Sequence, residues 1–116
     1  MEDEKFRILF DQLCNLPYQA HWWTRVPVDQ VLSGIPSDCS DRSYVLADYC
    51  EKNNIPYKFI LTLFTKPISL HMALVVDGQV YDPMWPAYAM DIEKYKNLLG
   101  GSWGRVFGSW IQHVIP

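Results

Sequence analysis

Three residues of this 116-residue chain, Cys39, His71 and Asp82, carry the side chains of a nucleophile, a base and an orienting carboxylate. A helical pattern begins at Ser37-Asp38, so Cys39 falls near a helix N-terminus. Unpaired backbone N–H groups and the positive end of the helix dipole stabilise a thiolate there, which makes it a nucleophile. His71 enters one apolar run and Asp82 ends the next. Together they would complete a Cys-His-Asp triad.

The spacing of His71 and Asp82 fits a β-hairpin. Asp77-Gly78 is a strong turn signal between two apolar runs, and the two residues flank it at a separation of 82 − 71 = 11 positions. Such positions lie near each other at the open end of a two-residue hairpin. The imidazole and the carboxylate can therefore bond directly if both point to one face. The N-terminus of the Cys39 helix must then lie against that same end.

Each of the three residues also has a purely structural interpretation. Cys39 could be a buried thiol that packs as a small hydrophobe, His71 a half-buried histidine, and Asp82, which precedes a proline, an ordinary turn residue. His21 and His113 are alternative bases, but neither is bracketed by a suitable carboxylate. The combination of the three residues, in an order that a triad can use, favours the catalytic interpretation.

The elements that would position these residues form an α+β domain over residues 1–116, with helices first and an antiparallel meander after them. Apolar residues at helical spacing predict helices over residues 2–14 and 91–99, one or two turns over 27–32, and a central helix from Ser37 or Asp38 to about Lys52. β-Branched and aromatic runs predict strands over residues 57–64, 70–76 and 79–82, and a final strand over 105–115.

The central helix has a predicted buried face and a predicted outer face. The buried face consists of Cys39, Ser43, Leu46, Ala47 and Cys50. The residues expected to point outward are Arg42, Asp48, Glu51 and Lys52. Cys50, and Cys14 at the end of the first helix, are interpreted as packing residues.

Composition excludes several classes of protein. Hydrophobic residues make up 49% of the chain and aromatic residues 15%, which is typical of a globular domain. The net charge is −3 and no basic block is present, which argues against a nucleic-acid partner. No apolar run approaches the ~20 residues that span a bilayer, so no membrane partner is expected. An acidic N-terminus and an odd count of 3 cysteines favour reduced thiols and a cytoplasmic location.

Several short motifs resemble the transglutaminase-like, papain-related superfamily. They are Ser-Asp-Cys-Ser-Asp-Arg at 37–42, Asn-Ile-Pro at 54–56, His-Met-Ala at 71–73 and Tyr-Asp-Pro at 81–83. The family pattern is Gly-Asp-Cys-x-Asp, Gly-Ile-Pro, His-Ala-Trp and Asp-Pro. The upstream segment 23–29 is similar to the Trp-x-Thr-Pro-x-Glu run of bacterial transglutaminase-like cysteine proteinases. The departures are at Ser37, Asn54 and Met72-Ala73, none of which is a triad position.

The resemblance covers roughly residues 22–86 and implies a papain/transglutaminase-like core, in which the nucleophile helix packs on a small antiparallel sheet. It also implies that Cys39 is the nucleophile, His71 the base and Asp82 its orienter. The expected activity is cysteine-dependent acyl transfer on amide or peptide bonds of a protein or peptide substrate, as a peptidase or amidase, without a cofactor. Transglutaminase or deamidase activity, and a catalytically silent binding module that kept the fold, remain the alternatives.

Two features of the expected site stay open. The Cys39 N–H and a second donor would hold the oxyanion, and the candidates for the second donor are Trp23, Trp22, Gln19 and Gln30. The two tryptophans could equally fill the core. A metal site would have to combine the three triad residues with Asp38 or Asp41, but no CxxC or HxxxH spacing supports one, so no metal is expected.

Overall fold

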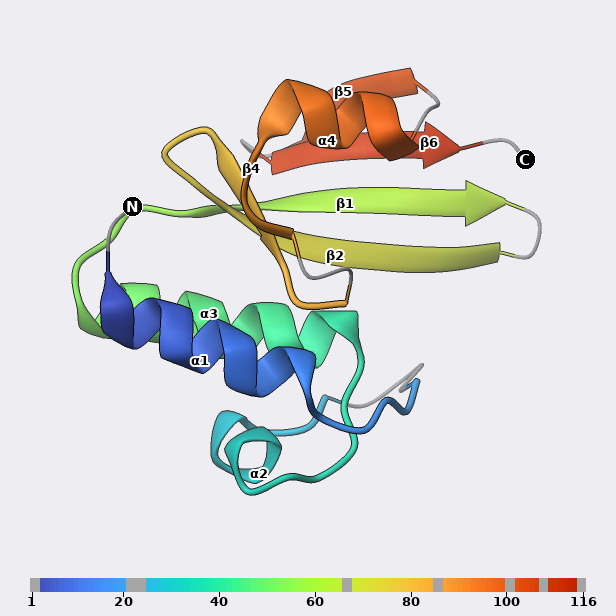
Figure 1. Ribbon diagram of the computed structural model, residues 1–116. Helices are drawn as coiled ribbons and strands as arrows, with labels where there is room; N and C mark the ends of the chain where they lie inside the picture. Colours follow the sequence, from blue (N-terminus) through green and yellow to red (C-terminus); the bar gives the residue numbers. More distant parts are fainter. Residues whose placement is uncertain are drawn as a thin grey trace.

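The computed structural model describes residues 3–20, 25–65, 68–84, 87–99, 102–106 and 109–114. It is an α+β structure with a single mixed sheet (Figure 1). The helices are α1 (Glu4–Cys14), α2 (Val28–Leu32), α3 (Cys39–Lys52) and α4 (Ile92–Leu99). The strands are β1 (Lys58–Thr65), β2 (Ile68–Val76), β3 (Gln79–Asp82), β4 (Ala87–Asp91), β5 (Ser102–Val106) and β6 (Ser109–Val114). Among the described helices, none has the length and apolar character needed to cross a bilayer.

The sheet has the order β4-β3-β2-β1-β6-β5. The first three strands form the predicted antiparallel meander, and β4 extends it by one antiparallel strand. The β2–β3 turn has positive φ angles at both Asp77 (52°) and Gly78 (74°), the conformation that a type I′ hairpin turn requires. The sheet also contains one parallel pair that was not predicted, because β6 pairs with β1 in parallel.

Two strands differ from the predictions. The single strand predicted over 105–115 is instead the hairpin of β5 and β6, and β4 was not predicted. β5 holds one β-branched residue and a glycine, so its strand pattern is weak. β4 contains two alanines, has a positive φ of 55° at Ala89, and pairs with β3 through a register shift. Such irregular strands carry little alternation in the sequence.

Helices cover both faces of the sheet. α1 and α3 lie side by side on one face, where Phe6 and Leu46 pack with Leu74 and Tyr81 (Figure 1). The residues that pack on the opposite face, together with α4, are Ile60, Ala73, Val75, Val80 and Tyr95. The sheet is therefore the middle layer of three, and its residues can connect the α3 side with the α4 side.

The predicted buried face of α3 is confirmed, since Cys39, Ser43, Leu46, Ala47 and Cys50 are all buried. The prediction that Arg42 points outward is wrong: the residue is only 2% exposed. Its guanidinium donates to the Ser37 hydroxyl and to the carbonyls of Leu16 and Pro17. The segment after α1 folds over the first turn of α3, so its carbonyls receive this buried charge in place of water.

Candidate active site

Cys39 is the first residue of α3, and a reciprocal cap holds it there. The Asp41 N–H donates to Asp38 Oδ1 and the Asp38 N–H donates to Asp41 Oδ2, both at 3.0 Å. Two acidic side chains thus satisfy two of the donors that a helix start leaves unpaired. The cap fixes the direction of the first turn, and with it the Cys39 side chain, which is 9% exposed.

The first turns of α3 dock on an edge of β2 that β3 does not cover. β3 pairs with β2 only from Leu74 to Val76. Beyond that ladder, the Cys39 Sγ lies 3.8 Å from the Leu70 carbonyl oxygen, and the Ser43 hydroxyl donates to the Met72 carbonyl at 3.1 Å. Because alternate carbonyls of a strand point to the same edge, side chains one helical turn apart can contact both. This docking brings Cys39 to the strand that carries His71.

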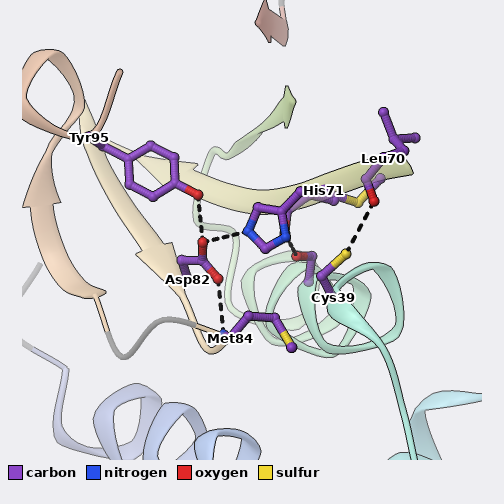
Figure 2. Close-up of polar contacts among 8 residues, drawn as sticks. Cys39, Leu70, His71, Asp82, Met84 and Tyr95 are labelled. Carbon is purple, nitrogen blue, oxygen red and sulfur yellow. Dashed lines mark hydrogen bonds and ion pairs between the residues drawn. The ribbon is translucent and has the colours of Figure 1, made fainter. Parts of the chain in front are cut away.

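His71 and Asp82 are brought together by the β2–β3 hairpin. The Nε2 atom of His71 lies 2.7 Å from the Oδ2 atom of Asp82 (Figure 2). Leu74 is opposite Tyr81 in the ladder, so Asp82 falls opposite position 73 and is the diagonal neighbour of His71 on the same face. The carboxylate is fully buried, and the His71 side chain is 14% exposed.

Asp82 has two further hydrogen-bond donors. The Tyr95 hydroxyl, from α4, donates to Oδ2 at 2.5 Å, and the Met84 N–H donates to Oδ1 at 3.0 Å. A carboxylate without access to water needs such donors to remain charged. Burial, together with the charge of Asp82 and the bond to it, raises the pKa of Tyr95, so this hydroxyl keeps its proton.

Tyr95 was missed in the sequence analysis. It lies in the predicted final helix, where Ile92, Tyr95 and Leu99 share one apolar stripe. That stripe could have indicated a buried tyrosine, whose hydroxyl then needs a partner. Nothing in the sequence indicates that the partner is Asp82.

The electrostatics of His71 favour its protonated form. Burial acts to lower its pKa, but the hydrogen bonds to Asp82 and Cys39 and the charges of both residues act more strongly and raise the pKa to about 10. Since Nε2 is engaged with Asp82, the other ring nitrogen lies on the Cys39 side of the ring (Figure 2). The imidazole therefore stands between the thiol and the carboxylate.

Of the predicted oxyanion donors, Gln19 lies beside Ser37, two residues before Cys39. Tyr18 forms a parallel β-bridge with Ser37, and the Gln19 N–H donates to the Ser37 carbonyl at 3.2 Å. Gln19 is thus exposed beside the segment that leads into Cys39. Gln30 is exposed on α2. Trp22 and Trp23 lie outside the described residues, as does His21. Just after this segment, the Val26 N–H donates to Asp41 Oδ1 at 2.9 Å.

The other predicted base and the other hollows lie elsewhere. His113 lies in β6, opposite Leu63 of β1. Two surface hollows adjoin Pro56 and Tyr57, one of them also lined by Gly78. These residues follow the C-terminal end of α3, whereas Cys39 begins it. Neither hollow thus belongs to the Cys39 site.

Within the part of the chain that the structure describes, no cluster of three or more His, Cys, Asp or Glu side chains is arranged to hold a metal ion. None of the family models, curated proteins or solved structures compared with this chain matches it. The likeness to the transglutaminase-like superfamily therefore stays a prediction from short motifs. The function of the site has to be argued from its own geometry.

Proposed function

We propose that the protein is a cysteine-dependent acyl-transfer enzyme acting on amide or peptide bonds, with Cys39 as nucleophile, His71 as acid and base, and Asp82 as its orienting carboxylate. One observation carries the proposal: His71 Nε2 lies 2.7 Å from Asp82 Oδ2, and the other ring nitrogen lies on the side of Cys39, at the start of a helix (Figure 2). A nucleophile beside a base that a third group orients is the arrangement that covalent catalysis requires.

The reaction begins with a protonated His71 beside a Cys39 thiolate. The Cys39 sulfur attacks the substrate carbonyl carbon, and the carbonyl oxygen takes up the negative charge. His71 then gives its proton to the leaving amine, the C–N bond breaks, and a thioester on Cys39 remains. His71, now neutral, removes a proton from water as the water oxygen attacks the thioester carbon. The C–S bond then breaks, which releases a carboxylic acid and restores the Cys39 thiolate beside protonated His71.

The choice between hydrolysis and transfer lies in the second half of this cycle. If an amine replaces water, the same thioester gives transamidation, and if the substrate is a side-chain amide, water gives deamidation. All three reactions need the same three residues, so the triad alone does not favour one of them. A peptidase or amidase is the simplest case because water is always present as the acceptor.

The oxyanion would bind at the start of α3. Backbone N–H groups of a first helical turn have no partner within the helix, and the Cys39 N–H is one of them. Gln19 is a suitable candidate for the second oxyanion donor, because the hydrogen bond from its backbone N–H to the Ser37 carbonyl holds it beside the chain that enters α3. Trp22 and Trp23 remain candidates on the segment between Gln19 and Val26.

Selective alkylation tests the nucleophile without a known substrate. Iodoacetamide at about pH 6, followed by mass spectrometry, should label Cys39 several-fold faster than the other two cysteines. An ordinary thiol is roughly 0.3% ionised at that pH. Cys14 and Cys50 are internal controls, because burial raises the pKa of both, that of Cys50 to about 11. His71→Ala should slow the labelling of Cys39 and leave the controls unchanged.

The same experiment distinguishes an enzyme from a binding module. Slow labelling of all three cysteines, with no response to His71→Ala, would refute the proposal and favour a module that retains the fold without the chemistry. If Cys39 is selective, release of amine from a library of peptide amides identifies the substrate, with Cys39→Ala as the inactive control.

A further inference from the structure

The carboxylate oxygen that binds His71 also binds a tyrosine. Asp82 Oδ2 accepts from the Tyr95 hydroxyl at 2.5 Å and faces His71 Nε2 at 2.7 Å. Tyr95 is 1% exposed and Asp82 is fully buried, so water does not compete for this oxygen. In a triad the orienting carboxylate has to bind only the base, and here Tyr95 is a second group on the same oxygen atom (Figure 2).

We propose that Tyr95 is a positioning residue for the acid–base step: its hydroxyl holds the Asp82 carboxyl group turned toward His71 and weakens the hold of Asp82 on the His71 proton. The proposal rests on the proposed function, because the proton in question is the one that His71 gives to the leaving amine. It assigns a role to a residue of α4, on the face of the sheet opposite α3.

The physical reason is that each hydrogen bond donated to a carboxylate stabilises its charge and lowers its affinity for a proton. Asp82 and His71 share one proton, so a donor to Asp82 makes the pair release that proton more readily. The bond matters most after His71 has lost its proton, when Tyr95 and the Met84 N–H are left to stabilise the buried charge. Without Tyr95, the pair would hold its proton too tightly for an efficient acid.

The charges that face the pair come from several elements. Cys39 of α3 acts on the pKa of His71, and Tyr95 of α4 bonds to Asp82. The charge of Asp82 also acts on Cys14, at the end of α1, but it is only a minor cause of the raised pKa of that thiol. Since Cys39 and Asp82 both raise the pKa of His71, the effect of Tyr95 is best measured with Cys39 removed.

The test is the titration of His71 by ¹⁵N NMR of histidine-labelled protein in a Cys39→Ala background, with the signal assigned from His71→Gln. Tyr95→Phe removes only the hydroxyl. It should strengthen proton binding by the pair roughly threefold to tenfold, because the lost hydrogen bond stabilises the unprotonated pair more than the protonated one. The midpoint therefore moves to higher pH.

Tyr81→Phe is the matched control. Tyr81 is also fully buried, but its hydroxyl faces Gln79 at 3.5 Å on the other face of the sheet. Tyr81→Phe should leave the midpoint of the His71 titration unchanged. Replacing Tyr95 by 3-fluorotyrosine, a stronger donor of similar size, should lower the midpoint, and this second variant decides the matter if Tyr95→Phe does not fold.

An unchanged or lower midpoint in Tyr95→Phe, or the same shift in Tyr81→Phe, would overturn the role of Tyr95. Because the nucleophile is absent in these proteins, the titration does not depend on activity. Failure of Cys39 to alkylate selectively would defeat the proposed function and leave this result intact, so the two failures are distinguishable.

Discussion

The Ser43 hydroxyl donates to the Met72 carbonyl at 3.1 Å, one helical turn after Cys39 and one residue after His71. Ser43 is fully buried, and α3 and β2 meet through this bond. Cys39 on the helix and His71 on the strand thus have a shared attachment point outside the proposed triad. Because Ser43 is not itself one of the proposed reacting residues, replacing it tests how the scaffold positions the site.

Ser43→Ala should slow alkylation of Cys39 at pH 6, because it loosens the N-terminal turns of α3 from β2. It should also cost ~1–3 kcal/mol of unfolding free energy, since the Met72 carbonyl loses a buried donor. Ser33→Ala is the control: its hydroxyl bonds to the Gln30 carbonyl at 2.8 Å in an exposed position, so both measurements should stay near the parent values. Equal effects of the two variants would show that the bond does not position Cys39.

Asp82→Asn should abolish most of the activity while the protein remains folded. The carboxylate holds the His71 tautomer and stabilises its positive charge, and loss of this function in a triad costs up to ~10⁴-fold in turnover. Asp77→Asn is a suitable control, because Asp77 is exposed in the β2–β3 turn and asparagine tolerates its φ of 52°. Full turnover by Asp82→Asn, with either water or an amine as acceptor, would reduce Asp82 to a structural residue.

Much of what positions Cys39, His71 and Asp82 was predictable from local signals. The start of α3 depends on the Asp38 cap, and the β2–β3 hairpin depends on the Asp77-Gly78 turn; both signals lie within a few residues of the structure they determine. The separation of His71 and Asp82 then follows from strand geometry, because residues two apart share a face. Short-range rules therefore account for the start of α3 and for the His71–Asp82 pair, but not for the docking of α3 on β2.

The rest depends on contacts between distant segments. Arg42 is buried only because the chain around Leu16 and Pro17 folds over it, 25 or 26 residues away in sequence. Tyr95 reaches Asp82 only because α4 packs on the far face of the sheet. The parallel pairing of β6 with β1 requires the chain to cross from one edge of the meander to the other. Periodicity within a window of a dozen residues contains none of this information.

The hydrogen bonds from the buried Arg42 guanidinium lead to a stability prediction. Arg42→Met should cost about 3 kcal/mol in urea unfolding, because the carbonyls of Leu16, Pro17 and Ser37 lose buried donors. Arg42→Lys should recover only part of this, since one ammonium cannot reproduce the fork of the guanidinium. Lys52→Met, on the exposed end of α3, should stay within ~0.5 kcal/mol of the parent. If Arg42→Met also stays within ~0.5 kcal/mol of the parent, the hydrogen bonds of Arg42 contribute little to the stability.

Gln19 can be tested separately from the nucleophile. If its amide stabilises the oxyanion, Gln19→Ala should lower turnover by ~10²–10³-fold. The same variant should leave iodoacetamide labelling of Cys39 unchanged, because alkylation forms no oxyanion. Gln30→Ala, on α2, should affect neither measurement. If Trp23→Phe, which keeps most of the volume and removes the indole N–H, lowers turnover instead, with melting unchanged, the donor is Trp23; a fall in stability alone places Trp23 in the core.

The raised pKa of His71 makes the stability of the protein depend on pH. The ordinary pKa of 6.5 applies to the unfolded chain and about 10 to the folded one, so the folded state binds this proton more tightly. The resulting stabilisation is fully present below pH 6.5 and is lost as the pH rises toward about 10. The difference in unfolding free energy between the parent and His71→Gln should therefore shrink across that window, by up to ~1.4 kcal/mol per pH unit.

Urea unfolding at several pH values between 6 and 10 measures this difference, and comparison with His71→Gln cancels groups that titrate equally in both proteins. The sign is decisive. A difference that stays constant or grows as the pH rises would mean that His71 is neutral in the folded protein. In that case Cys39 would enter the reaction as a thiol, and His71 would have to act first as a base that removes the Cys39 proton.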